Sequence, residues 1–381
     1  MKKTLILITI TTGFLVLFSC RTDSPKPGWK GKLGKEAGVT VVNNPVQPVF
    51  GLLNLELEEE LSIGGENRPE TLLGSIVSLA VDGEGNIYLG QMKPPALQLF
   101  NPAGKYLKTI GGFGQGPGEY QSPRALYIGP DGGTLYLRDD IFKILVYRLD
   151  GTYLREINLS RYCYDFLVDS QGFFWGIMSI HDENGQFKSL EKIGPDGKSL
   201  FQVVKKPYEL YTRTQGQSVM SISTGYEYDL MMTPLDKDSL VFGYSKEYEL
   251  TVMSFDGQAH LIIKNQQKAR PIPREELVEI GKYLNISEQP FFYRLLTDDL
   301  GRIWVLRDYP GARGKSGLNP KEYDVYSRDG YYLYRTSLPF GRRLLIRNGQ
   351  LWATYTDEEK GLIMVKRLRI KNWDKIRYSL E

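Results

Sequence analysis

One tight-turn motif recurs along this chain and constrains its fold more than any other feature. The motif has the form Asp-x-x-Gly-x-apolar-aromatic, and its clearest copies occupy residues 82–88, 169–175 and 298–304. A less regular copy lies at 131–136, and degraded copies lie at 236–241 and 348–352, which makes six. In each copy an apolar strand enters, Asp or Asn starts the turn, Gly supplies a positive φ angle and a β-rich strand leaves. Recurrence at this spacing predicts a repeat architecture built from hairpins.

A second turn follows most copies, at 100–105, 147–152, 194–197, 255–257 and 326–331. Two hairpins per unit make four antiparallel strands, which is one blade of a β-propeller. The six predicted blades span about 70–112, 120–160, 161–206, 226–265, 290–338 and 341–371. One aromatic residue recurs at the same place in the second strand, and we expect it to pack between neighbouring blades: Tyr88, Tyr136, Trp175, Trp304 and Trp352.

The last unit is one strand short, because the chain offers too few residues after 362–369 for another strand. The segment 55–65 precedes the first unit and parallels residues 106–112, the fourth strand of that unit. If strand 55–63 pairs into the sixth blade, the ring closes and leaves no sheet edge bare. The predicted fold class is therefore all-β: a six-bladed β-propeller with four antiparallel strands per blade, the last blade completed by an N-terminal strand.

The first residues have the form of an export signal. Lys2 and Lys3 precede an apolar segment that ends in Leu17-Phe18-Ser19-Cys20. A segment of this length is short for a membrane-spanning helix and typical of a secretory signal. Its last four residues resemble the bacterial lipobox, in which the chain is cut before a cysteine that carries lipid; an ordinary signal peptide with an incidental cysteine is the alternative. This predicts a signal peptide at 1–19, lipidation and membrane anchoring at Cys20, a flexible Pro- and Gly-containing tether at 20–48 and the propeller at 49–381.

The linker between the first two units carries a family resemblance. Residues 111–123 read Gly-Gly-Phe-Gly-Gln-Gly-Pro-Gly-Glu-Tyr-Gln-Ser-Pro and closely resemble the linker of NHL-repeat propellers, as does the turn at 82–88 before them. Together with the lipobox, the chain resembles the TolB-like, NHL-related six-bladed propeller lipoproteins of Bacteroidetes-type bacteria. The resemblance implies a fold and a place in the cell envelope, but no activity. Residues 21–24 lack an acidic cluster like the surface-export signals of this group, which favours the periplasmic side of the outer membrane over the cell surface.

Charge and cysteine content exclude several classes of function. Loss of Lys2 and Lys3 with the leader reduces the 48 basic residues to 46, against 45 acidic ones, and no basic run remains. Nucleic acid is therefore not an expected partner. If Cys20 is acylated, Cys163 has no cysteine partner, and we expect it to be a small buried apolar side chain.

No motif in the chain identifies a catalytic or cofactor site. His181 and His260 are the only histidines, and the predicted topology places them on opposite rims. The glycine-rich residues 112–116 lack the strand–helix context of a nucleotide-binding loop, and residues 309–316 only faintly resemble a Walker A motif. Residues 82–86 space their oxygen ligands like a calcium loop but lack its closing glutamate, so a hairpin turn is the better interpretation. We expect no metal and no cofactor.

Topology predicts where a site lies. The long loops at 138–140, 179–187, 207–228, 264–290 and 307–322 share one face with the blade-to-blade linkers, and apolar spacing after Pro273 predicts a short helix at 273–285. The candidate binding residues gather where the innermost strands begin on this face or in its loops: Arg124, Arg138, Asp139, Tyr164, Asp165, Tyr228, Tyr293, Arg294, Arg307, Asp308, Tyr309 and Arg343. Arginine and tyrosine dominate binding hot spots, although such residues also solvate a channel mouth or pair with one another.

The favoured hypothesis is a non-catalytic binding or scaffolding lipoprotein that presents its loop-bearing face to a protein, peptide or glycan of the cell envelope. The alternative is a lyase or hydrolase acting on an envelope or dietary polysaccharide, with its site at the central channel. A divalent ion at the channel, held by acidic or histidine ligands, would favour the enzyme, and an exposed aromatic patch on the loop-bearing face would favour the binding protein.

Overall fold

The computed structural model describes residues 28–65, 72–139, 142–208, 211–215, 218–222, 224–280, 286–308, 320–339, 344–357 and 359–380. The predicted leader and lipidation site at Cys20 lie outside these residues, as do the predicted site residues Tyr309 and Arg343. No helix of the described residues is long and apolar enough to cross a membrane.

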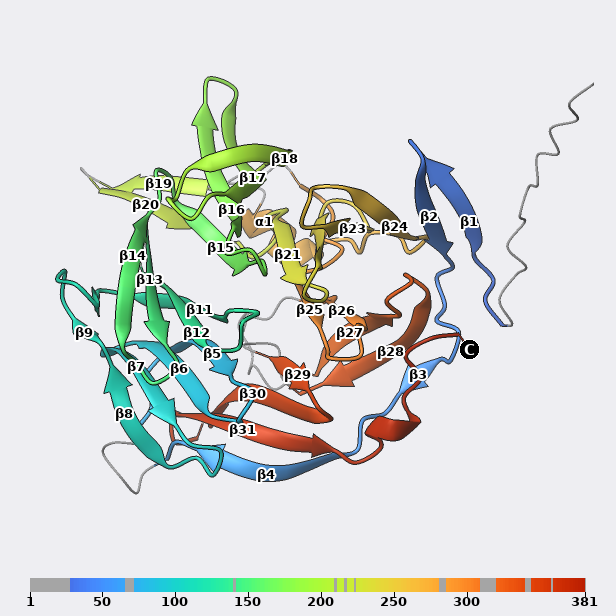
Figure 1. Cartoon of the computed structure of the whole chain (residues 1–381). Helices are drawn as coiled ribbons and strands as arrows, with labels where there is room; N and C mark the ends of the chain where they lie inside the picture. Colours follow the sequence, from blue (N-terminus) through green and yellow to red (C-terminus); the bar gives the residue numbers. More distant parts are fainter. Residues whose placement is uncertain are drawn as a thin grey trace, which may run out of the picture.

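Six blades, each of four antiparallel strands, stand around a central channel, which confirms the predicted fold class (Figure 1). Further strands extend the sheets of blades four and five to six and five strands. From the channel outward, blade one contains β5 (Ile76–Val81), β6 (Ile87–Met92), β7 (Pro95–Phe100) and β8 (Tyr106–Ile110). Blade two contains β11 (Pro123–Ile128), β12 (Thr134–Asp139), β13 (Lys143–Arg148) and β14 (Tyr153–Asn158). Blade three contains β15 (Cys163–Val168), β16 (Phe174–Asp182), β17 (Gly185–Ile193) and β18 (Ser199–Pro207). Blade four contains β21 (Leu230–Pro234), β22 (Ser239–Tyr244), β23 (Glu249–Ser254) and β24 (Ala259–Asn265). Blade five contains β25 (Arg294–Thr297), β26 (Ile303–Leu306), β27 (Lys321–Tyr326) and β28 (Tyr332–Leu338). Blade six contains β29 (Leu345–Arg347), β30 (Gln350–Asp357), β31 (Leu362–Ile370) and β4 (Leu57–Ile63).

The recurring turn motif has a hydrogen-bonding explanation. In the copy of blade five, Oδ1 of Asp298 accepts the backbone N–H groups of Leu300 and Arg302, each at 3.0 Å. Oδ2 of the same carboxylate accepts Nε1–H of Trp304 at 2.8 Å. Asp169 and Trp175 repeat this side-chain bond at 3.3 Å, and in blade one a tyrosine hydroxyl replaces the indole. The aspartate thus closes the turn and orients the aromatic residue six positions later, which explains their fixed spacing.

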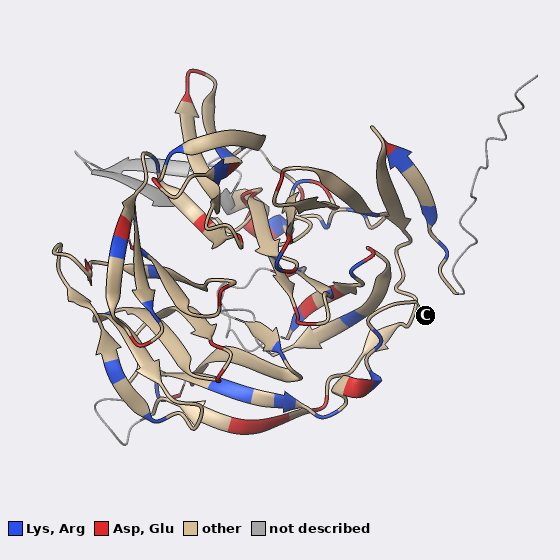
Figure 2. Ribbon diagram, in the orientation of Figure 1, with Lys and Arg blue, Asp and Glu red and all other residues tan. Residues whose placement is uncertain are grey.

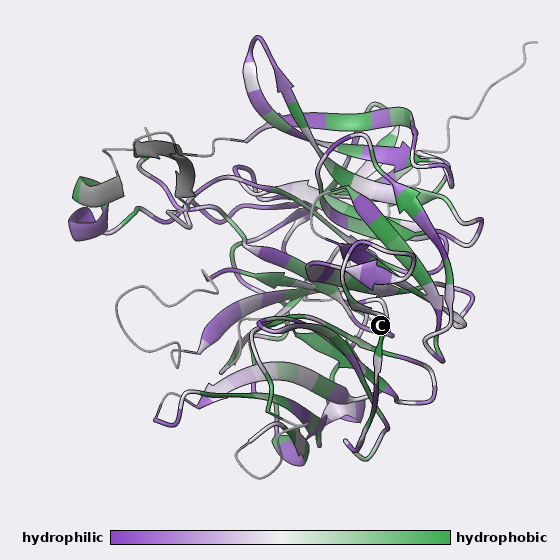
Figure 3. Cartoon of the chain, turned by 90° about the vertical axis from the view of Figure 1, so that its left-hand side faces the viewer, coloured by the Kyte–Doolittle hydropathy of each residue, from purple (hydrophilic) through white to green (hydrophobic). Residues whose placement is uncertain are grey.

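The hydrophobic core is divided among the six spaces between neighbouring blades, as the five recurring aromatic residues predict. Trp175 of blade three packs in one cluster with Met232 and Leu240 of blade four, and Trp304 of blade five packs with Leu351 of blade six. Figure 3 shows the blades edge-on, with their apolar segments running through the interior of the molecule. Each blade therefore buries its apolar faces only by contact with its neighbours, so the ring must close to complete the core.

The N-terminal strand closes the ring as predicted. β4 pairs antiparallel with β31, from Leu57 opposite Ile370 to Ile63 opposite Val365. Three consecutive acidic residues of β4 meet basic residues of β31: Glu58 pairs with Arg369, Glu59 with Lys366 at 2.9 Å and Glu60 with Arg367 at 3.2 Å. Figure 2 shows this acidic segment beside the basic one. Ile63 also joins the cluster that links blades six and one, so closure combines strand pairing, ion pairs and apolar burial.

The prediction of a flexible tether at 20–48 is wrong for residues 28–48. β1 (Lys32–Glu36) and β2 (Val39–Asn44) form a hairpin whose second strand pairs in parallel with β24, and β3 (Leu52–Leu53) then pairs with β28. The reason is burial: Trp29 is 7% exposed and packs edge-on against Tyr331 at 4.9 Å between ring centroids. Asn44 is fully buried, and its Oδ1 accepts Nε1–H of Trp29 and the backbone N–H of Tyr332. The segment therefore lies along the outer edges of blades four and five before it completes blade six.

The long linkers contain some structure that the sequence reasoning did not predict. β9 (Gly112–Phe113) and β10 (Glu119–Tyr120) pair in the glycine-rich linker, and β19 (Tyr211–Gln215) pairs with β20 (Ser218–Ile222) between blades three and four. Within the predicted helix at 273–285, α1 (Arg274–Ile280) is described, and residues 281–285 lie outside the described residues. Leu277 of α1 packs with Tyr226 and Ile272 in a small separate cluster. The helix stands away from the blades on one side of the ring (Figure 3).

Candidate functional site

A cavity of about 630 Å³ lies at the mouth of the central channel, on the face where the innermost strands begin. The innermost strands of the first five blades line it, and Leu344 extends the lining to the start of β29 in blade six. The loops and blade-to-blade linkers open on this same face, because each blade starts and ends there. The volume is in the range of small-molecule sites, roughly 300–1,000 Å³. The fold thus brings first residues from distant parts of the chain into one concave surface.

Three β-bulges turn side chains into the cavity. In the first three blades, the register of the innermost strand shifts by one residue near its start. The shifts lie between Ile76 and Ser78 in β5, between Pro123 and Ala125 in β11, and between Cys163 and Asp165 in β15. The extra residues are Val77, Arg124 and Tyr164, and all of them line the cavity. A bulge re-aims a side chain while the strand keeps its pairing, so the scaffold itself orients these residues.

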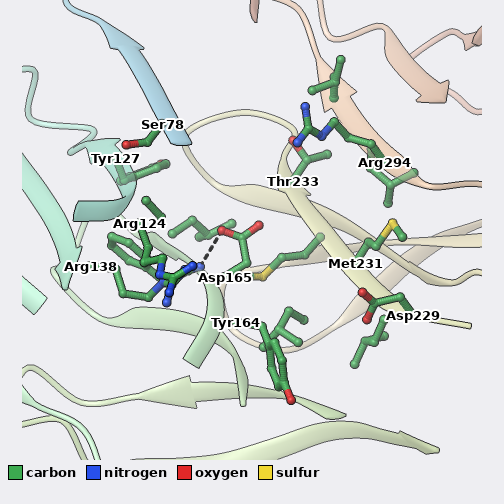
Figure 4. Close-up of a pocket in the computed structure, with 18 of the residues that line it drawn as sticks. Ser78, Arg124, Tyr127, Arg138, Tyr164, Asp165, Asp229, Met231, Thr233 and Arg294 are labelled. Atoms are coloured by element: carbon green, nitrogen blue, oxygen red, sulfur yellow. Dashed lines mark hydrogen bonds between the residues drawn. The ribbon is translucent and has the colours of Figure 1, made fainter. Parts of the chain in front are cut away.

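Six of the twelve residues predicted from the sequence line this cavity: Arg124, Arg138, Tyr164, Asp165, Tyr293 and Arg294. Arg138 of β12 lies opposite Ala125, the residue after the bulge at Arg124, so the two arginines come from adjoining positions of one blade. Figure 4 shows both arginines and Asp165 pointing toward one another, with Arg294 approaching from another side.

Asp139 and Tyr228 do not line the cavity. Asp139 is 5% exposed, and its carboxylate accepts the backbone N–H groups of Gln121 at 3.0 Å and Ser122 at 2.6 Å. It therefore fastens the end of the first blade-to-blade linker. The hydroxyl of Tyr228 donates to the carbonyl of Glu288 at 3.3 Å, which ties the start of blade four to the linker that follows it.

Arg307 and Asp308 are not among the residues that line the cavity, and they belong to structural networks. Nη1 of Arg307 lies 2.9 Å from Oδ2 of the fully buried Asp324, which also accepts Nε–H of Arg335 at 2.9 Å. Burial opposes ionisation of Asp324, but the two guanidinium groups, together with hydrogen bonds from Tyr248 and Tyr332, outweigh it and hold the pKa of this carboxyl below its usual value. Asp308 accepts Nη1–H of Arg270 at 2.9 Å. The bond between Asp308 and Arg270 joins blade five to the linker that precedes it, whereas the bonds of Asp324 with the two arginines lie within blade five.

The lining residues that the sequence reasoning missed include Tyr162, Lys188, Tyr208 and Asp229. The rings of Tyr162 and Tyr164 lie 4.6 Å apart between centroids, and those of Tyr164 and Tyr208 lie 5.5 Å apart; we name these three residues the tyrosine wall. Tyr162 and Tyr164 flank Cys163, the first residue of β15, so this pair of tyrosines was visible in the sequence. The sequence reasoning named only Tyr164 as a candidate. Tyr208 follows the outermost strand of blade three, so its presence at the channel depends on tertiary structure.

Lys188 supports the tyrosine wall from inside. It is 3% exposed, and its Nζ lies 3.8 Å from the ring centre of Tyr164 and 3.6 Å from that of Tyr208. The same ammonium donates to Oδ1 of Asp229 at 2.6 Å. Burial holds the pKa of Lys188 below its usual value, although Asp229 opposes this effect. The cation thus joins two rings of blade three to the first residues of blade four.

The described part of the cavity has a basic excess. Four cationic side chains line it, Arg124, Arg138, Lys188 and Arg294, against the carboxylates of Asp165 and Asp229. Burial raises the pKa of both Tyr127 and Tyr164 to about 12, so these phenols remain neutral hydrogen-bonding groups at physiological pH. Among the described residues, no group of three or more His, Cys, Asp and Glu side chains is placed to hold a metal ion. The arrangement is suited to hold an anionic ligand that also offers hydrogen bonds and an apolar face.

Comparisons with known proteins agree with this fold. A family model described as "Domain of unknown function (DUF4934)" matches residues 66–298. The structure is similar to that of a Bacteroides fragilis protein named as exported, with a TM-score of 0.54 and 12% identity over 86% of this chain and 100% of that chain. It is also similar to a DUF4221 family member from Bacteroides vulgatus (TM-score 0.47, 13% identity, 83% of this chain and 98% of that chain) and to virginiamycin B lyase from Staphylococcus aureus (0.44, 12%, 83% and 99%). No curated protein matches the chain.

Proposed function

Because the chain belongs to the DUF4934 family, whose description names no function, we propose its function from the geometry of the cavity. The protein is a non-catalytic binding or scaffolding protein of the cell envelope. It presents the loop-bearing face of its propeller to a protein, peptide or glycan and holds part of that partner in the cavity at the channel mouth.

One observation carries this proposal: the innermost strands of five blades, with Leu344 just before that of the sixth, meet at a cavity lined by arginine and tyrosine side chains. A closed ring of sheets is a rigid scaffold, and side chains held on rigid elements lose little conformational entropy when they bind. The buried ammonium of Lys188 packs against the rings of Tyr164 and Tyr208 and so fixes two residues of the tyrosine wall. Such a surface is organised before its ligand arrives, which favours tight and specific binding.

The location is part of the same proposal. A lipid on Cys20 anchors the protein to the outer membrane, with the propeller on the periplasmic side, as in the TolB-like and NHL-related lipoproteins that the sequence resembles. The Bacteroides fragilis protein with a similar fold is named as exported, which supports export of this chain. Labelling cells with a fatty-acid analogue tests the anchor. The full chain should carry the label, and the Cys20→Ser variant should not; a labelled Cys20→Ser variant would contradict the anchor.

The binding function is tested by capture from envelope extracts. The acyl-free mature chain, made with Cys20→Ser, is immobilised beside an Arg124→Gln variant, which alters the cavity, and an Arg148→Gln variant. Arg148 is exposed on β13 and does not line the cavity, so it serves as a matched control. A component retained by the parent chain and Arg148→Gln, but released by Arg124→Gln, supports the proposal. Components retained equally by all three chains, or by none, would overturn it.

The same captured component distinguishes binding from catalysis. It is incubated with the parent chain, and its mass and chain length are followed over time. The proposal expects the component to be recovered unchanged. Progressive cleavage that Arg124→Gln slows would instead assign the cavity to the lyase or hydrolase class.

A further inference from the structure

We infer that the cavity takes an acidic sugar: a pyranose ring that carries a carboxylate and free hydroxyls, as at the end of a uronate-containing glycan. This inference rests on the proposed binding function and names the ligand class of the same cavity. It follows from three kinds of group that the lining offers together, each suited to a different part of such a sugar.

The carboxylate matches the arginines of blade two. Arg124 is the extra residue of the β11 bulge, and Arg138 lies beside it on β12, so their guanidinium groups share one corner of the cavity. A guanidinium presents its N–H donors as a planar fork that fits a carboxylate through two parallel hydrogen bonds. Arg294 of β25 adds positive charge from another side of the cavity (Figure 4). The basic excess of the lining thus selects an anion over a neutral ligand.

The ring matches the tyrosine wall. Three contiguous aromatic rings line the cavity edge to face, with centroids 4.6 and 5.5 Å apart and interplanar angles of 70° and 68°, and they offer apolar ring surface beside their hydroxyl groups. The C–H face of a pyranose is apolar while its rim is polar, so it stacks on such rings and keeps its hydroxyls free for hydrogen bonds. Because Lys188 holds the rings of Tyr164 and Tyr208, the platform does not need to be ordered at the moment of binding.

The hydroxyls match the two carboxylates. Asp165 and Asp229 line the cavity, and an ionised carboxylate accepts hydrogen bonds but donates none. Lys188 occupies one acceptor site of Asp229 at 2.6 Å, and a carboxylate has about four such sites, so it can accept further hydrogen bonds. A ligand that carried only negative charge would be repelled by them, whereas sugar hydroxyls donate to them. The combination of guanidinium groups, aromatic rings and carboxylates therefore fits an acidic sugar better than a simple anion or an acidic peptide.

Isothermal titration calorimetry tests the inference with three probes added to the acyl-free mature chain. The probes are digalacturonic acid, its dimethyl ester, which has the same rings without charge, and triglutamate, an acidic peptide. We expect digalacturonic acid to bind, and the ester to bind about 10- to 100-fold more weakly because it loses a charge-assisted hydrogen-bonded pair. Triglutamate should bind at least about 10-fold more weakly than digalacturonic acid, because it offers no ring to the tyrosine wall.

Matched variants assign the binding to the two parts of the cavity. Arg124→Gln should weaken digalacturonic acid about 10-fold or more and leave the ester unchanged, whereas Tyr162→Ala should weaken both sugars. Arg148→Gln should change neither. Circular dichroism and the unfolding midpoint of each variant exclude loss of fold as the cause.

The outcomes separate this inference from the proposed function. Equal binding of acid and ester, or tighter binding of triglutamate, would overturn the acidic-sugar assignment and leave a binding protein of another ligand class. The same holds if none of the three probes binds while capture from envelope extracts still depends on Arg124. Failure of that capture would overturn the proposed function itself.

Discussion

Replacing Asp298 by alanine tests whether the turn aspartates hold the propeller together or only shape their turns. The side chains of Asp298 and Arg302 are both 0% exposed, and Nε of Arg302 lies 2.7 Å from Oδ2 of Asp298. The same oxygen accepts Nε1–H of Trp304, and Oδ1 accepts two backbone N–H groups. Alanine at this position would leave a buried guanidinium without its carboxylate and a buried indole without its acceptor.

The structure sets the magnitude of this loss. Breaking a buried ion pair by removing one partner costs about 3–5 kcal/mol, against a total stability of about 5–15 kcal/mol for a folded domain. Asp131 lies in the corresponding turn of blade two, two residues after Gly129, which takes the backbone position of Asp298. Asp131 is exposed, and its carboxylate accepts the backbone N–H groups of Gly133 and Thr134 and the hydroxyl of Thr134. Asp131→Ala should therefore cost only about 1 kcal/mol. Both variants remove an aspartate that accepts backbone N–H groups in a turn, but only Asp298→Ala also leaves buried side chains without their partner.

Urea unfolding at pH 7, followed by tryptophan fluorescence and by circular dichroism, measures both losses. A double variant, Asp298→Ala with Arg302→Met, replaces the stranded charge by an apolar side chain and should recover a large part of the stability. If Asp298→Ala lost no more stability than Asp131→Ala, or if the double variant were less stable than the single one, the reasoning about the buried pair would be refuted.

Three further predictions follow from other parts of the ring. The folded pKa of Asp324 lies below its usual value because its two arginines, together with hydrogen bonds from Tyr248 and Tyr332, outweigh burial, so the stability it provides is complete above about pH 4 and is lost as the pH falls through the folded pKa. Acid unfolding should therefore be steeper for the parent chain than for Asp324→Asn, and equal slopes would contradict this. Burial raises the pKa of the Cys163 thiol to about 12, so in the acyl-free mature chain it should resist iodoacetamide at pH 8 until the chain is unfolded in urea; rapid labelling of the native protein would show that this site opens. Gly197→Ala would place a Cβ 2.2 Å from the carbonyl oxygen of Asn158 in the preceding blade and should cost about 1–3 kcal/mol more than Gly132→Ala, whose new Cβ meets nothing within 4 Å at a similar positive φ. Equal unfolding midpoints for the two alanine variants would argue against tight packing between blades.

The sequence predicted the blades because their chemistry is local. An aspartate, the glycine three residues later and the aromatic residue six positions on form one hydrogen-bonded unit, as Asp169, Gly172 and Trp175 show, so the pattern is readable in a short window. Ring closure was also predictable, because counting strands left one gap and one spare strand, and β4 fills that gap.

The prediction of a flexible tether failed because the order of this segment depends on contacts that are distant in the sequence. Residues 28–48 are rich in polar side chains, and their order depends on a few contacts with partners far along the chain. Trp29 packs against Tyr331, and Asn44 bonds to groups of blades four and five. The sequence alone offered only Trp29 and the β-branched residues of 39–42 as a signal that this segment is buried.

In the candidate site, too, topology predicted some residues, and only tertiary contacts placed the others. Topology alone predicted a site at the starts of the innermost strands, and Arg124, Tyr164 and Arg294 line the cavity that the structure has there. Arg307 and Asp308 have the same residue character as site residues, but Arg307 forms a buried pair with Asp324, and Asp308 forms a partly exposed pair with Arg270. Tyr208 and Lys188 reach the cavity from other strands of blade three, and no short sequence window contains that information.

The sequence by itself determined the repeat, the number of blades and the strand that closes the ring, because turn geometry and strand alternation act over a few neighbouring residues. Tertiary structure alone decided which polar side chains face the channel and which form buried pairs. It also decided that Lys188 contacts the rings of two tyrosines. The physical reason is that a side chain's environment in a propeller is set by the blades on either side of it. Those neighbours lie dozens of residues away along the chain, or, for blade six, at its opposite end.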